Sequence, residues 1–126
     1  MKRCYFGAVL LAALLAAALG ATCVVDRCQS PVAEALASGS EAFQNREPDA
    51  GKSRVADARL QWTRCRSVTA ALVDHGPMEA VDAAFAQLEV YIRTGDWDTA
   101  AALCADLSSQ VEAIVDSHRP NWWNLL

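Results

Sequence analysis

The sequence predicts an all-α protein, in which an N-terminal transmembrane or signal helix is followed by a small antiparallel helical-hairpin bundle of about four helices. Hydrophobic residues make up 53% of the 126 residues, and alanine is prominent among them. Alanine is the best helix former, whereas the helix-interrupting residues Gly and Pro number only six and four. Beyond an uncharged N-terminal run, apolar residues recur every three to four positions, which is the spacing of one buried helix face.

The first element is an N-terminal hydrophobic segment, residues 1–25. Lys2 and Arg3 precede an uncharged run, Cys4–Val25. As a helix this run is about 33 Å long, enough to cross a hydrocarbon core of ~30 Å. We expect a single-pass cell-membrane anchor, with the basic start in the cytoplasm and residues 26–126 forming an extracytoplasmic α-helical domain. Two alternatives also export the domain: a cleaved signal peptide, giving a secreted protein, and a lipid-modified Cys23.

The second element is a helix expected to begin at Ser30 and end near Asn45. Ser30 suits the N-cap, and Pro31 suits the first helical position because its missing N–H has no intrahelical partner there. The stretch Arg46–Gly51 is expected to be a loop. Asp49 within it is expected to cap the next helix.

The centre of the predicted domain is a helical hairpin. Its first helix is expected to reach about Val73, its turn to lie at Asp74–Pro77, and its second helix to end near Arg93. Each helix carries an apolar stripe, and the two stripes are expected to be buried. Their residues are Val55, Ala58, Trp62, Cys65, Thr69 and Leu72 before the turn, and Met78, Val81, Phe85, Leu88 and Ile92 after it. We expect Trp62, Phe85 and Leu88 to be structural.

A fourth helix is expected to begin at Asp96, which is a strong N-cap, directly after the helix-ending Gly95. Pro120 prevents this helix from continuing. Its buried stripe is Ala100, Leu103, Leu107, Val111 and Ile114. The apolar segment Trp122–Leu126 follows, and we expect it to dock between the helices and complete the core. A recognition tail is the alternative.

The distribution of charge argues against nucleic-acid binding. Residues 26–66 carry seven basic and six acidic groups, whereas residues 67–126 carry two basic and nine acidic groups. An acidic half of this kind lacks the basic face that nucleic acid requires. Lys52, Arg59 and Arg66 recur every seven residues and are expected to form ion pairs across the hairpin. The acidic residues opposite are Glu79, Asp82 and Glu89. Contact with anionic headgroups or cell-wall polyanions is the alternative.

One group of side chains has the composition of a zinc site. It consists of Asp74, His75, Glu79 and Asp82, with His118 as a further candidate. We expect Pro77 to interrupt the helical spacing between His75 and Glu79, and no HExxH motif is present. We therefore expect no catalytic residue, cofactor or metal. A metal sensor or metal-dependent enzyme using the Asp74-His75 turn remains the alternative.

The five cysteines leave the disulfide state open. Cys4 lies in the uncharged run, and Cys23 and Cys28 lie near its end. Cys65 and Cys104 lie on or beside the apolar stripes, so in an exported domain they are candidates for a disulfide. Two buried free thiols are an equal alternative. No pair has the CxxC spacing of zinc or thioredoxin-like chemistry.

Five short elements, in order behind a basic start and one hydrophobic span, resemble an uncharacterised bacterial family, the domain of unknown function 4363. They are Trp62, Asp74-His75, Tyr91-Ile92, Gly95-Asp96-Trp97 and Asn124-Leu125-Leu126. The resemblance covers nearly the whole chain and implies a small membrane-anchored helical protein, mostly of Gram-positive bacteria. It implies no activity. We therefore expect a non-enzymatic interaction or scaffold module that binds an unknown protein partner through a helical groove.

Overall fold

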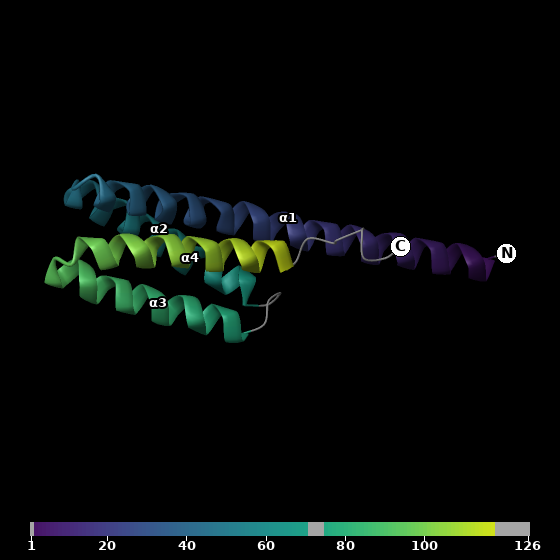
Figure 1. Ribbon diagram of the computed structural model, residues 1–126. Helices are drawn as coiled ribbons and strands as arrows, with labels where there is room; N and C mark the ends of the chain where they lie inside the picture. Colours follow the sequence, from purple (N-terminus) through teal and green to yellow (C-terminus); the bar gives the residue numbers. More distant parts are fainter. Residues whose placement is uncertain (1, 71–74, 118–126) are drawn as a thin grey trace.

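The computed structural model describes residues 2–70 and 75–117, with side chains from residue 5 onward (Figure 1). This part of the chain contains four helices and no strand. They are α1 (Lys2–Gln44), α2 (Pro48–Thr69), α3 (His75–Thr94) and α4 (Trp97–Ser117). Successive helices run antiparallel, and α1 extends far beyond the other three toward the N-terminus (Figure 1). The prediction of an all-α bundle behind a long apolar helix is confirmed.

All four helices contribute to one core, and α1 makes the most extensive contacts. α1 packs along both α2 and α4, and α3 packs mainly on α4, whereas the backbones of α2 and α3 barely approach each other. The largest fully buried side chains come from all four helices and include Trp62, Phe43, Phe85, Leu36, Leu88 and Leu107. The predicted stripes of α2, α3 and α4 are buried, except that Ile92 and Leu103 are only partly so. Leu72 lies outside the described residues.

The expectation that a helix begins at Ser30 is wrong, because α1 runs unbroken from the uncharged segment through Pro31 to Gln44. The hydroxyl of Ser30 donates to the carboxylate of Asp26 at 3.3 Å, one turn back, so it caps nothing. An interior proline costs a helix about 3 kcal/mol. Burying a large apolar side chain returns about 1.5–3 kcal/mol, and α1 buries several around Pro31, including Val32 and Leu36. Packing therefore outweighs the local signal.

The connection between α1 and α2 is shorter than predicted. Arg46 has a positive φ of 61° and reverses the chain, and α2 begins directly after it with Pro48 in its first turn. Glu47 occupies the N-cap position without a side-chain hydrogen bond. The prediction that Asp49 is the N-cap is therefore wrong, and Asp49 lies within the first turn of the helix, where its charge favours the dipole.

The turn between α3 and α4 follows its prediction. Gly95 has a φ of 76°, a left-handed conformation that glycine adopts without strain. Asp96 accepts hydrogen bonds from the hydroxyl of Thr99 at 2.7 Å and from its backbone N–H at 3.2 Å. Because both bonds favour the carboxylate form, they lower the pKa of Asp96. Asp96 thus caps α4, as predicted.

Candidate interaction site between α2 and α3

Long side chains join α2 to α3 across the gap between their backbones. The indole Nε1 of Trp62 donates to Oδ1 of Asp82 at 2.9 Å, although the Trp62 side chain is otherwise buried. The same carboxylate pairs with Arg66 at 3.1 Å and with Arg59 at 3.6 Å. Asp82 thus anchors α3 to three side chains of α2. The hydrogen bond from Trp62 was not foreseen, because its stripe alone suggests packing.

The predicted pairing of the basic stripe is confirmed for Arg59 and Arg66 but not for Lys52. Arg59 reaches Glu89 at 4.0 Å as well as Asp82, and its guanidinium lies 5.1 Å from the ring centroid of Phe85. Lys52 instead lies 3.8 Å from Asp49 on its own helix and over the ring of Trp97. Arg59 and Arg66 therefore join α2 to α3 by ion pairs, whereas within the described residues Lys52 forms no ion pair with α3.

Beside these ion pairs lies an apolar groove of about 440 Å³, which we call the α2–α3 groove. Its lining residues are Lys52, Val55, Ala56, Arg59, Leu60, Thr63, Glu89 and Ile92. Leu60 in this lining is 52% exposed, so a large apolar side chain is open to a partner. The groove exists because α2 and α3 are bridged by long side chains instead of packing backbone to backbone. It is the candidate interaction site.

The structure places the candidate metal ligands differently from the prediction. α3 begins at His75, so Gly76 and Pro77 lie within its first turn, where a missing N–H is tolerated. His75 and Glu79 therefore share one helix, and both side chains are exposed. Asp82 is held by Trp62 and two arginines. Among the described residues, no three His, Cys, Asp or Glu side chains are grouped closely enough to hold a metal ion. Asp74 and His118 lie outside these residues.

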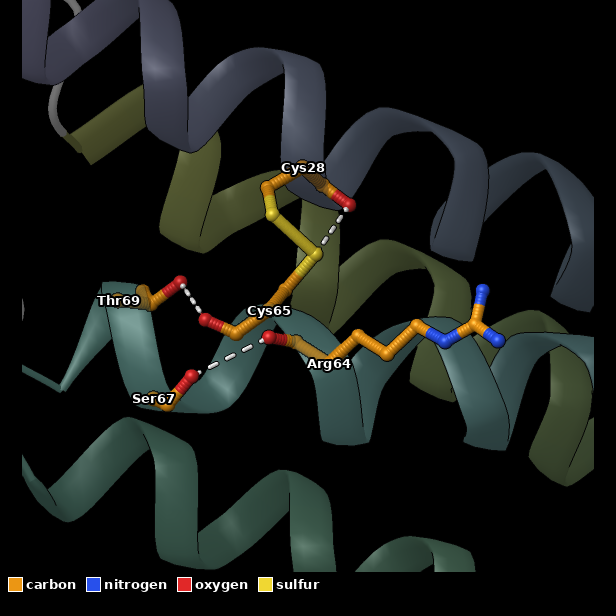
Figure 2. Close-up of a disulfide and its surroundings, with 5 residues drawn as sticks. All are labelled: Cys28, Arg64, Cys65, Ser67 and Thr69. Carbon is orange, nitrogen blue, oxygen red and sulfur yellow. Dashed lines mark hydrogen bonds between the residues drawn. A yellow bond between two sulfur atoms is a disulfide. The ribbon is translucent and has the colours of Figure 1, made fainter.

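A disulfide joins Cys28 of α1 to Cys65 of α2, with 5.7 Å between the Cα atoms (Figure 2). The predicted Cys65–Cys104 bridge is therefore wrong. Ser40 and Ser108 bond the backbones of α4 and α1 on either side of Cys104, which places Cys104 level with the middle of the bundle. Cys65 lies beside Cys28, closer than Cys104 to the end of the bundle from which the N-terminal part of α1 extends. The two predicted partners thus sit at different heights.

Around this bridge, local hydrogen bonds close the end of α2. The hydroxyl of Thr69 donates to the carbonyl of Cys65 at 2.8 Å, and Ser67 donates to the carbonyl of Arg64 at 3.4 Å (Figure 2). Thr69 is buried, so this bond satisfies a hydroxyl that has no access to water.

The two described free cysteines differ in environment. Cys23 is exposed, whereas Cys104 is buried, so the alternative of two buried free thiols holds for Cys104 but not for Cys65, which is bridged to Cys28. Burial raises the pKa of Cys104 to about 12, so its thiolate is scarce at neutral pH. Neither residue lines the α2–α3 groove.

Gln29 is one of the core residues that sequence reasoning missed. Its side chain is fully buried on the inner face of α1, and within the described part of the chain neither amide atom has a hydrogen-bond partner. A polar residue breaks an apolar stripe, so its position four residues after Val25 and before the buried Ala33 was the only available signal. The segment Trp122–Leu126, which was expected to dock between the helices, lies outside the described residues.

Comparison with known proteins gives a family but no characterised relative. No curated protein and no solved structure matches the chain. A family model described as "Domain of unknown function (DUF4363)" matches residues 23–125. This range includes α2, α3, α4, the part of α1 from residue 23 onward, the disulfide and the α2–α3 groove. With most of its length matched, the chain belongs to the uncharacterised family of the domain of unknown function 4363.

Proposed function

We propose that this protein is a membrane-anchored, extracytoplasmic, non-enzymatic interaction module that binds a protein partner in the α2–α3 groove. The observation that carries the proposal is the groove itself. It has an apolar floor of Val55, Leu60 and Ile92 between two helices that leave room for a third element. Grooves of this form bind amphipathic helices by their apolar faces.

The charges at the rim suggest the chemistry of the partner. Lys52 and Arg59 line the α2 side, and Glu89 lies on the α3 side. Arg59 already has two carboxylate partners, whereas within the described residues the amino group of Lys52 pairs with one exposed aspartate on its own helix and lies over the ring of Trp97. A matching partner helix therefore carries an apolar stripe flanked by an acidic residue where it passes Lys52.

The form of α1 supports an anchored domain. Within the described residues, it is the one helix long and apolar enough to cross a membrane, and a signal sequence passes the same test. Its large apolar side chains point outward and are exposed, including Leu11, Leu14 and Leu15. A helix that contributes these residues to no core requires a different apolar environment.

Site-specific photocrosslinking in living cells tests the groove. A photoreactive phenylalanine analogue at Ala56, inside the groove, is expected to give a discrete adduct with one protein. Leu60→Asp, introduced into the same chain, is expected to lower that adduct at least tenfold, because it places a charge on the apolar floor. The adduct is measured by immunoblot and identified by mass spectrometry.

A matched position on α4 provides the control. Ala105 is exposed and lies outside the groove. The analogue at Ala105 is expected to give no such adduct, and Ala105→Asp is expected to leave the Ala56 adduct unchanged. Equal adducts from both positions, or an Ala56 adduct that survives Leu60→Asp, would exclude the groove as the binding site.

A further inference from the structure

The proximal end of the bundle is our name for the end from which the N-terminal part of α1 extends (Figure 1). Ser108 on α4 donates to the carbonyl of Ala33 on α1 at 2.9 Å. Because the two helices are antiparallel and rise equally per residue, Val111, three residues beyond Ser108, lies about level with Gln29. The disulfide to α2 leaves α1 at Cys28, the residue before Gln29. The bridge and Gln29 therefore share one level of the proximal end.

The core at the proximal end is built from smaller and more polar side chains than the rest of the core. Among the described residues, its buried members are Val25, Gln29, Cys65, Thr69, Met78, Val111, Ile114 and Val115. The fully buried rings of Phe43, Trp62 and Phe85 all lie farther from this end. Because the stabilisation from apolar burial scales with the area buried, packing contributes less at the proximal end than at the level of these rings.

Gln29 destabilises the closed form of this end. Its side chain is fully buried, and neither its Nε2 nor its Oε1 has a hydrogen-bond partner within the part of the chain that the structure describes. The buried hydroxyl of Thr69, by contrast, donates to the carbonyl of Cys65. A buried amide without hydrogen bonds retains its full desolvation penalty, and water that reaches the amide removes this penalty. Opening of the proximal end is therefore favoured by hydration of Gln29.

The disulfide lies where it can oppose this opening. It ties α1, directly before Gln29, to Cys65, and α2 ends four residues later at Thr69 (Figure 2). The backbone of α3 barely approaches α2, so α3 does not pack the end of α2 against α1. The ion pair from Arg66 to Asp82 on α3 involves a half-exposed guanidinium and adds little. The covalent bridge is therefore the main restraint on the end of α2.

A dithiol reductant can reach this bridge through one of its two cysteines. Cys28 is partly exposed, whereas Cys65 is buried. A thiolate of the reductant attacks the Sγ of Cys28, the S–S bond breaks, and the sulfur of Cys65 leaves as a thiolate and takes up a proton. The second thiol of the reductant then attacks the reductant's own sulfur in the mixed disulfide. This step releases Cys28 as a thiol and leaves the reductant oxidised to its disulfide.

We propose that the Cys28–Cys65 disulfide is a redox-sensitive clamp on the proximal end. When oxidised, it keeps the end of α2 closed over Gln29. When a dithiol reduces it, the end of α2 separates from α1 and the amide of Gln29 becomes hydrated, while the core around the buried rings stays packed. The inference goes beyond the proposed function, because it uses neither the α2–α3 groove nor the membrane anchor.

Hydrogen exchange measured by mass spectrometry tests the clamp on the full chain in detergent micelles, with and without dithiothreitol. We expect reduction to accelerate exchange at least tenfold in residues 63–69, at the end of α2, and less than twofold in residues 50–58, at its start. Cys104 provides a second readout, because it is buried farther from the proximal end. In the reduced chain, Cys28 and Cys65 are expected to be alkylated and Cys104 to stay protected.

Two matched variants test the part assigned to Gln29. Gln29→Met keeps the length of the side chain and removes the amide, so we expect reduction to accelerate exchange less than threefold in residues 63–69 of this variant. Gln87→Met makes the same change at an exposed position on α3 and is expected to keep the full acceleration. Equal exchange before and after reduction overturns the clamp, as does an acceleration spread evenly over both ends of α2. An undiminished acceleration in Gln29→Met overturns the role of the buried amide. Circular dichroism of each variant verifies that the bundle is folded.

Discussion

Trp62 combines packing with a polar contact in one side chain. Its ring is 1% exposed in the core, while its Nε1 donates to Asp82, the residue that also binds two arginines. Trp62→Ala removes both contributions and is expected to cost about 3–5 kcal/mol, against the total of about 5–15 kcal/mol typical of a domain. Urea unfolding of the full chain in detergent micelles measures this loss.

Trp62→Phe separates the two contributions. It keeps most of the apolar contact and removes the donor, while Asp82 keeps Arg59 and Arg66 as partners. We expect a loss of about 0.5–1.5 kcal/mol, the usual net value of one hydrogen bond. A loss as large as that of Trp62→Ala would show that the hydrogen bond, and not the buried ring, holds α2 to α3.

Gly51 is required by the ring that covers it. A Cβ at this position would lie 2.5 Å from Cε1 of Phe43, and that ring is stacked on Trp97 with centroids 5.7 Å apart. Helix propensity favours alanine by about 0.5–1 kcal/mol. The clash outweighs this gain, and we expect Gly51→Ala to lower stability by about 1–3 kcal/mol.

Gly39 is the matched control, since it lies in the same α1–α2 interface. An added Cβ there would meet Arg54 and Val55 at an ordinary 3.5 Å. Gly39→Ala is therefore expected to leave stability unchanged or to raise it by up to about 1 kcal/mol. If both glycine variants behave alike in urea unfolding, Phe43 does not constrain Gly51.

At the scale of the element, α1 combines an interior proline with the most extensive packing among the described helices. Its interior Pro31 is exposed and has no N–H to donate. If one helix runs through this position, Pro31→Ala restores a hydrogen bond, and we expect it to raise stability by up to about 3 kcal/mol. If Pro31 began a second helix, the same change would be neutral or unfavourable. Thermal unfolding followed by circular dichroism distinguishes the two.

The Cys28–Cys65 bridge joins α1 to α2 across a separation of 37 residues. In the chain-entropy model, closing a loop of that size stabilises the folded state by about 4 kcal/mol. We expect Cys28→Ser/Cys65→Ser to lower stability by about 2–4 kcal/mol. Non-reducing peptide mapping is expected to show the linked pair, with Cys104 alkylated only after unfolding, because Cys104 is buried. A Cys65–Cys104 peptide would contradict the pairing.

A feature could be predicted from the sequence where the residues that determine it lie close together along the chain. The stripes of α2, α3 and α4 and the cap at Asp96 depend on residues within a few positions, and they were found. The disulfide depends on the height of Cys65 against α1 and α4, which only the assembled bundle sets. Ser30 and Pro31 gave a valid local signal that burial of the same helix overrode. The α2–α3 groove arises from packing and has no periodic pattern in the sequence, and the helical spacing of Gln29 between Val25 and Ala33 does not by itself show that a polar side chain is buried.

At the scale of the whole molecule, one helix belongs both to the apolar segment and to the core. Val25 is buried in the bundle, so the uncharged run ends where the domain begins. A flexible linker of several residues commonly separates independent units, and α1 has none at this junction. Cleavage within the segment would leave α1 shorter but would preserve the bundle, because the disulfide lies beyond it at Cys28.

Orientation is the prediction that concerns the whole chain. Lys2 and Arg3 are the basic residues that precede the uncharged run, and basic flanks are retained in the cytoplasm. Alkaline phosphatase fused after Leu126 is therefore expected to be active, since it folds with its disulfides only outside the cytoplasm. The same enzyme fused to residues 26–126 alone is the control and is expected to be inactive. Activity of both fusions, or of neither, would contradict export by this segment. N-terminal sequencing of the membrane fraction then separates a retained anchor, which begins near Met1, from a cleaved signal. We expect the retained form, because the exposed apolar face of α1 is long enough to span the bilayer and leads directly into the core.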